Sequence, residues 1–248
     1  MPLLAHLTEL RARLIRMIAA VSIAAGASYY FADALFAFLT TPLMQLNTSD
    51  AGLGGVRLIG TGVVEAFFTK LKVAVIAGIF LSSPVLLHQI WQFVAPGLYE
   101  TEKRYMIPFV SCGTLFFLFG AGFCYTSVLP VGYHFFIEQY ATIGVAPEIR
   151  ISEYLTFTAR MLLAFSITFE LPVVTFFLAR IGLVTHTWMI HHSRYAVLVI
   201  FILAAVLTPG PDIASQLLLA GPLLLLYGMS IGVAWLVARE RAVPPASE

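Results

Sequence analysis

The sequence is poor in charge. Only 11% of its 248 residues are Asp, Glu, Lys or Arg, whereas a typical soluble domain has about 25%. Hydrophobic residues make up 60% of the chain and the mean hydropathy is +0.91. This balance excludes an ordinary soluble domain and predicts an integral membrane protein. The formal net charge of +1 gives no electrostatic basis for a nucleic-acid partner.

Cysteines are few, and enzyme motifs are missing. The two cysteines, Cys112 and Cys124, would point roughly 120° apart on one helix, so we expect packing residues and no mutual disulfide. The sequence has no HExxH, GxSxG or P-loop motif, which argues against an enzyme, including an intramembrane protease. Three histidines occur in the segment 186–195 without a cysteine or an acidic cluster, so we predict neither a metal site nor a cofactor.

Long apolar segments dominate the chain. A membrane-spanning helix needs about 20 mostly apolar residues, and six segments are candidates: 15–38, 70–92, 106–130, 155–180, 195–208 and 215–237. No soluble domain or low-complexity linker separates them. We therefore predict an all-α integral membrane protein with six transmembrane helices, in which residues 1–248 form a single polytopic membrane domain.

The fifth of these segments is unusually short. Tyr195–Leu207 would form only about 20 Å of helix before the turn Thr208–Pro211 ends it. Such a span would thin the bilayer locally, unless Arg194 snorkels to the interface and the span is ordinary.

Lys and Arg residues predict the orientation. With an even number of spans both termini lie on one side, and that side has more basic residues than the other. The terminal side carries Arg11, Arg13, Arg16, Lys103, Arg104, Arg180, Arg194, Arg239 and Arg241, and the opposite side carries Arg57, Lys70, Lys72, Arg150 and Arg160. The positive-inside rule therefore predicts that both termini are cytoplasmic.

The N-terminal stretch HLTELRARLIR has leucines at helical spacing. It predicts an interfacial amphipathic helix that leads into the first span, or a solvated helix with an i,i+4 pair such as Glu9–Arg13. Its arginines precede the apolar run MIAAVSIAAGAS, as in a secretory signal. The apolar run continues through Tyr29–Phe31, so we expect an uncleaved first helix.

Glu170 lies in the fourth apolar segment, where the nearest other charged residues are Arg160 and Arg180. An ionisable group at mid-membrane is costly and usually faces a cavity or a partner. Pro172 has no N–H, so the carbonyl of Thr168 loses its normal helical partner. These residues predict a polar notch at bilayer depth. The notch serves a ligand, a proton or a partner helix, or it makes an internal hydrogen bond to a neighbouring helix.

Two loops carry further candidates. Gln89–Tyr105, on the predicted cytoplasmic side, combines interfacial aromatic residues, a Pro-Gly turn and two acids, Glu100 and Glu102. These carboxylates either pair with the basic residues that follow them or bind a guanidinium ligand through two parallel hydrogen bonds. In the outer turn LTPGPDIASQ, Asp212 is expected to cap the last helix, and Gln216 remains available for a contact in the membrane.

Taken together, these stretches resemble one family, TatC, the multispanning core of the twin-arginine protein translocase. The matching stretches are HLTELRARL, EAFFTKLKVAV, SSPVLLHQIWQFVAPGLYETEKR, GAGFCYTSVLP, FELPV and RYAVLVIFILAAVLTPGPDIASQLLLAGPLLLLY. They cover nearly the whole chain in order. The resemblance implies a concave helical arrangement with a short fifth and sixth span, located in the plasma (inner) membrane of a prokaryote. It also implies export of folded proteins driven by the proton-motive force.

The resemblance further implies a binding and assembly subunit rather than an enzyme. The implied contacts for a signal peptide with two consecutive arginines lie at the cytoplasmic face: Glu9 and Glu102, supported by Arg11, Phe93 and Pro96. The implied contacts for the single-span partners TatA and TatB lie in and near the membrane. They are Glu170 in a polar pocket, beside the notch residues Thr168 and Pro172, and Pro209, Asp212 and Gln216 at a docking surface. Other TatC copies and the lipid bilayer are further expected partners.

The sequence departs from the family pattern in places that concern partner contacts more than signal recognition. Tyr227 is followed by Gly228 where the family often has an acid, and Arg150 stands where an acid is expected. An alternative function is a proton-coupled secondary transporter with Glu170 as proton carrier. Such folds usually show paired broken helices in two repeats, and the segments around Pro84 and Pro172 do not otherwise align.

Overall fold

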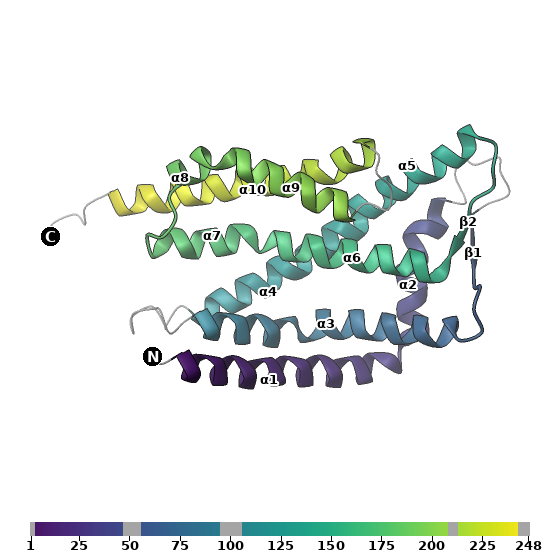
Figure 1. Cartoon of the computed structure of the whole chain (residues 1–248), viewed down its shortest axis with the longest axis horizontal. Helices are drawn as coiled ribbons and strands as arrows, with labels where there is room; N and C mark the ends of the chain where they lie inside the picture. Colours follow the sequence, from purple (N-terminus) through teal and green to yellow (C-terminus); the bar gives the residue numbers. More distant parts are fainter. Residues whose placement is uncertain (1–2, 47–55, 95–105, 208–212, 243–248) are drawn as a thin grey trace.

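The computed structural model describes residues 3–46, 56–94, 106–207 and 213–242, which are almost entirely helical (Figure 1). The elements, in chain order, are α1 (Leu3–Tyr29), α2 (Ala32–Leu46), β1 (Arg57–Ile59), α3 (Glu65–Val94), α4 (Met106–Phe123), the π-helical turn η3 (Cys124–Val128), α5 (Leu129–Thr142), β2 (Glu148–Arg150), α6 (Ile151–Phe169), α7 (Leu171–Arg180), α8 (His186–His191), α9 (Ser193–Leu207) and α10 (Ile213–Ala242). α1 lies along α3, and α10 packs along α7 (Figure 1).

The first predicted span, 15–38, is broken. α1 and α2 meet at an 88° bend, so the prediction of one continuous helix is wrong. Asp33 lies in the first turn of α2, where the helix dipole favours an acid. Its carboxylate pairs with Nζ of Lys70 on α3 at 2.7 Å. Hydropathy reports the length of an apolar run and not the point at which the run changes direction.

The third predicted span, 106–130, is longer than expected. α4, η3 and α5 form one apolar stretch from Ile107 to Tyr140. Within it the N–H of Leu129 donates to the carbonyl of Cys124, which makes one wider turn. Pro130 follows directly and has no N–H to donate, so the regular hydrogen-bond pattern must change at this point.

The remaining predicted spans coincide with observed helices. Among the described residues, four stretches are long and apolar enough to cross a membrane: Glu65–Phe93, Ile107–Tyr140, Ile151–Arg180 and Gln216–Arg239. The bent pair α1–α2 provides a fifth, and the total of six stays a prediction. α9 has 15 residues, or about 22 Å of helix, and is short as predicted. α10 has 30 residues, so the prediction of a short sixth span is wrong.

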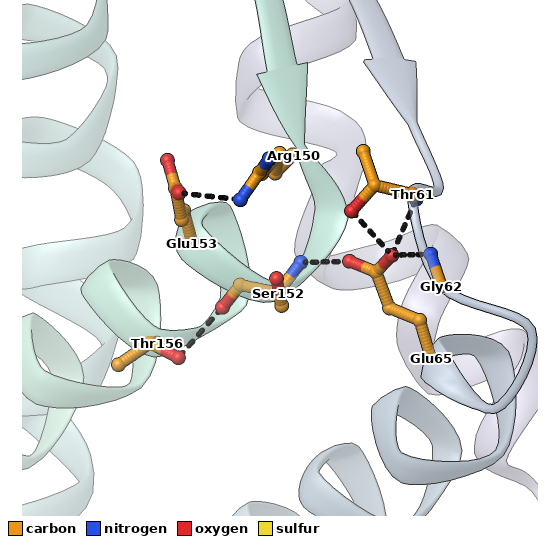
Figure 2. A network of polar contacts seen from close by, with 7 residues as sticks. All are labelled: Thr61, Gly62, Glu65, Arg150, Ser152, Glu153 and Thr156. Carbon is orange, nitrogen blue, oxygen red and sulfur yellow. Dashed lines mark hydrogen bonds and ion pairs between the residues drawn. The ribbon is translucent and has the colours of Figure 1, made fainter.

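Two short strands, absent from the all-α prediction, lie at the end of the molecule away from the chain termini (Figure 1). β1 pairs with β2 in parallel, with Arg57 opposite Glu148. Beside them, Glu65 at the start of α3 accepts three backbone hydrogen bonds (Figure 2). The N–H groups of Thr61 and Gly62 donate to Oε2 at 2.6 and 3.1 Å, and that of Ser152 donates to Oε1 at 3.2 Å. One carboxylate thus joins the start of α3 to the start of α6.

The core forms where helices cross closely. Its fully buried side chains come mainly from α2, α5, α6 and α10, and include Leu43, Leu129, Leu155, Phe165 and Leu223. Many large apolar side chains are instead exposed, such as Ile23, Leu115 and Val206. Exposed apolar surface over most of a helical molecule is expected where lipid is the solvent.

Candidate functional site

A chain of polar side chains joins α1 to α3 at the end where the described N-terminus lies. The Nε of Arg13 donates to Oε1 of Glu9 at 3.0 Å, and its Nη2 contacts the same oxygen. The Nη1 of Arg13 donates to Oε1 of Gln92 at 2.7 Å. The amide of Gln92 in turn meets Nε2 of His88 at 2.8 Å. The expected Glu9–Arg13 pair is therefore present, and it extends across to the neighbouring helix.

These hydrogen-bonded side chains position part of the predicted signal-peptide-binding site. Glu9 is half-buried and Arg11 is exposed on α1, while Phe93 is half-buried on α3 next to Gln92. The Arg13–Gln92 hydrogen bond thus holds together the two helix ends that carry Glu9 and Phe93. Pro96 and Glu102, the other predicted members of the site, lie outside the described residues.

The residues that complete this chain are not evident from the sequence. The spacing of His88 and Gln92 places them on one face of a helix, which is the only local signal for their contact. The Arg13–Gln92 bond joins residues 79 positions apart, and no periodicity within either segment predicts it.

Glu170 occupies the junction between α6 and α7 and is 9% exposed. Its carboxyl group lies against Gly113 of α4, where a Cβ atom would come within 3.1 Å of Oε2. Among the described residues neither carboxyl oxygen has a hydrogen-bond partner, and both are buried. The predicted buried carboxyl is present, but an internal hydrogen bond to a neighbouring helix is not found in the described structure.

The neighbours predicted to complete the notch do not contact the carboxyl through their polar groups. The hydroxyl of Thr168 donates to the carbonyl of Ala164 at 2.7 Å. Pro172 lies in the first turn of α7, a position where a missing N–H is tolerated. The N–H of Val174 donates to the carbonyl of Glu170 at 2.8 Å, so the helix resumes directly after the break.

A cavity of about 770 Å³ opens beside the α1–α2 bend. Its walls come from α1, α2, α3, α4, η3 and α6, and they include Phe31, Leu35, Phe80, Leu118 and Tyr125. Nearly all of the lining side chains are apolar. A space of this size and chemistry suits an apolar chain or helix segment, and not a polar metabolite.

Of the three predicted docking residues near the last turn, the structure describes one. The amide of Gln216 donates from α10 to the carbonyl of Phe201 on α9 at 2.9 Å, which ties the short fifth span to the sixth. Pro209 and Asp212 lie outside the described residues. Within the described ranges no group of three or more His, Cys, Asp or Glu side chains could hold a metal ion.

Bent apolar helices, a buried carboxyl at a helix junction and an apolar cavity define a polytopic α-helical membrane protein. The family model for TatC, the Sec-independent protein translocase protein, matches residues 5–222. The chain therefore belongs to the TatC family.

Individual relatives agree. The chain is 44% identical over 232 residues to a Sec-independent protein translocase protein TatC of Desulforapulum autotrophicum, covering 93% of this chain and 83% of that one. It is 39% identical over 234 residues to the TatC of Carboxydothermus hydrogenoformans, covering 94% and 93%. A crystal structure of the twin arginine translocase receptor TatC superposes with a TM-score of 0.83 at 34% identity, covering 94% of this chain and all of that one.

Membership in this family establishes the general role of the chain. It is a core component of the Sec-independent protein translocase and a multi-pass inner-membrane protein. The comparisons favour this role over the alternative of a proton-coupled secondary transporter.

Proposed function

We propose that this chain is the twin-arginine signal-peptide receptor and the assembly core of its translocase, and that it acts by binding rather than by catalysis. Folded proteins that carry the signal would cross the membrane at the expense of the proton-motive force. Family membership supports this proposal, as does the likeness to two solved structures described as twin arginine translocase receptors.

Glu9 and Glu102 are the proposed acidic contacts for the two arginines, with Arg11, Phe93 and Pro96 in support. The observation that carries this proposal is the Glu9 carboxylate, which already accepts a guanidinium group from Arg13. Both Arg13 nitrogens contact Oε1 of Glu9, and the two-bond geometry that arginine prefers would use Oε2 as well. Since Arg13 neutralises much of the Glu9 charge, we assign the stronger contact to Glu102.

The remaining contacts belong to membrane partners. We place the apolar part of the signal in a groove between the helices, and the cavity beside the α1–α2 bend supplies an apolar surface for it. Helices of the single-span proteins TatA and TatB would pack on the fourth to sixth spans, and TatA would assemble around the complex. Further TatC copies are also proposed partners. Their proposed contacts are Thr168, Glu170 and Pro172 at mid-span and Pro209, Asp212 and Gln216 near the last turn.

The test compares Glu102→Ala with Glu100→Ala, a matched loss of the same side chain two positions away. A photo-crosslinkable twin-arginine signal peptide is added to membranes that contain each full-length variant. Loss of one charge-assisted contact of about 1.5–3 kcal/mol should weaken binding roughly tenfold or more. We expect this loss for Glu102→Ala and near-normal crosslinking for Glu100→Ala.

A peptide with the two arginines replaced by lysines is the control for guanidinium recognition, because lysine cannot make the two-bond contact. Equal crosslinking by both variants would contradict the assignment of Glu102 as the arginine contact.

A further inference from the structure

The carboxyl group of Glu170 fills the place of a missing side chain. Gly113 is buried on α4, and a Cβ atom there would lie 3.1 Å from Oε2 and 3.5 Å from Oε1 of Glu170. Any other residue at position 113 would have to share this space with the carboxyl. A Cβ atom at position 113 would therefore displace the flexible Glu170 carboxyl by a few tenths of an ångström.

Among the described residues, the carboxyl has no hydrogen-bond partner in this position. Hydroxyl groups on nearby turns are already used, because Thr114, Ser166 and Thr168 donate to the carbonyls of Val110, Leu162 and Ala164 of their own helices. Both oxygens of Glu170 are buried without a partner in the described structure. Burying a polar group without a partner costs free energy. A hydrogen-bond donor that comes within reach would therefore favour a position in which the carboxyl contacts it.

A short path leads from this position to the outer surface. Ile167 and Val174 lie one turn before and one turn after Glu170 on neighbouring helix positions, and they are 65% and 37% exposed. The Glu170 carboxyl would reach the edge of this exposed apolar strip by rotation of its side chain.

We propose that the space beside Gly113 holds the Glu170 carboxyl in its buried position. A partner transmembrane helix would bring the carboxyl out of this position by presenting a hydroxyl or amide donor at the same depth. The proposal rests on the proposed function of Glu170 as a partner contact. The strip formed by Ile167 and Val174 accepts the apolar surface of such a helix, and the two unpaired oxygens require that the helix carry a polar donor. Gly113 is thus a positioning residue that sets how available Glu170 is.

The first measurement tests whether the Glu170 carboxyl leaves its buried position beside Gly113 and becomes accessible from the lipid. Membranes containing the full-length chain are treated with dicyclohexylcarbodiimide, an apolar reagent that modifies carboxyl groups reached from the lipid, and Glu170→Gln gives the background. We expect labelling of the wild-type chain above this background when the single-span partner proteins are present in the membranes, and less labelling when they are absent. Labelling no greater than that of Glu170→Gln would overturn the proposal without any change at Gly113.

The second measurement uses Gly113→Ser with Gly113→Ala as its matched control. Both variants add a Cβ atom, but only serine adds a hydroxyl that can donate to the buried carboxyl. We expect labelling of Gly113→Ser to fall roughly fivefold below that of Gly113→Ala, which is about 1 kcal/mol for one new hydrogen bond. Equal labelling of the two variants would overturn the proposal.

A third measurement separates this proposal from the proposed function. A photo-crosslinker at Ile167 reports a partner helix on the exposed strip. If Glu170→Gln and Glu170→Ala both leave partner crosslinking unchanged, the proposed function of Glu170 fails, whatever the labelling result. If those variants lose crosslinking while Gly113→Ser matches Gly113→Ala in both assays, the function of Glu170 stands and the role of Gly113 fails.

Discussion

Glu65, Glu9 and Glu170 are the same residue type in three different environments. Glu65 accepts three backbone N–H groups at the end of a helix, and Glu9 pairs with a guanidinium group. Glu170 is buried with no partner in the described structure. Hydrogen bonds to an ionised carboxylate stabilise it, whereas burial without a donor destabilises it. We therefore assign a structural role to Glu65, and the binding roles of the other two stay proposals.

Glu65→Gln should lower the thermal stability of the purified protein, and Glu65→Ala should lower it further. Glutamine keeps one acceptor oxygen but loses the charge, and alanine leaves the N–H groups of Thr61, Gly62 and Ser152 without this acceptor. The measurement is the melting temperature in detergent. Glu153→Gln is the control, because its pair with Arg150 is long, at 3.8 Å, and exposed (Figure 2). A control variant that loses as much stability as Glu65→Gln would contradict this role.

At the scale of the elements, small residues set how closely helices approach. A Cβ atom at Gly120 of α4 would lie 2.9 Å from the backbone oxygen of Phe165 on α6. At Gly78 of α3 it would lie 2.7 Å from the backbone nitrogen of Ala25 on α1. Neither helix pair can keep its present distance with a larger residue, which is the usual role of small residues between membrane helices.

Gly120→Ala should destabilise the protein by about 1–3 kcal/mol, the typical cost of overpacking, because backbone atoms of α6 would have to move. Gly122→Ala, two positions along α4, is the matched control, since a Cβ atom added there would meet no neighbouring element within 4 Å. Unfolding of both variants in the same detergent measures the difference. If the two alanine variants are equally stable, close packing of α4 on α6 does not limit stability.

At the scale of the whole molecule, the two described ends of the chain lie at one end, and the strand pair lies at the other (Figure 1). This arrangement agrees with an even number of crossings and with the predicted cytoplasmic location of both termini. Val63, near the strand pair, is fully exposed, and Leu183, at the turn after α7, is 72% exposed. The two positions therefore report on opposite faces of the membrane.

A single cysteine at Val63 should react with a membrane-impermeant maleimide added to intact cells, and a single cysteine at Leu183 should react only after the cells are opened. Both native cysteines, Cys112 and Cys124, are first changed to alanine. The measurement is the extent of labelling before and after disruption. The reverse pattern would place the termini on the outer face and contradict the positive-inside prediction.

Much of this protein is determined by local sequence. The positions of the apolar helices, the short α9 and the interruption at Glu170 and Pro172 all follow from the length of apolar runs and the chemistry of single residues. The Glu9–Arg13 pair follows from helical spacing. The resemblance to the TatC family likewise rests on motifs that can be read without coordinates, and the comparisons confirm it.

Only the tertiary structure decided the features that depend on residues far apart in sequence. The 88° bend between α1 and α2, the pairing of β1 with β2 and the bond between Arg13 and Gln92 each depend on a neighbouring element. The position of Glu170 over Gly113 belongs with them. Periodicity and composition report which face of a helix is apolar. They do not report which neighbour that face will meet, because the match of shape and hydrogen-bond donors between two helices is a property of the pair.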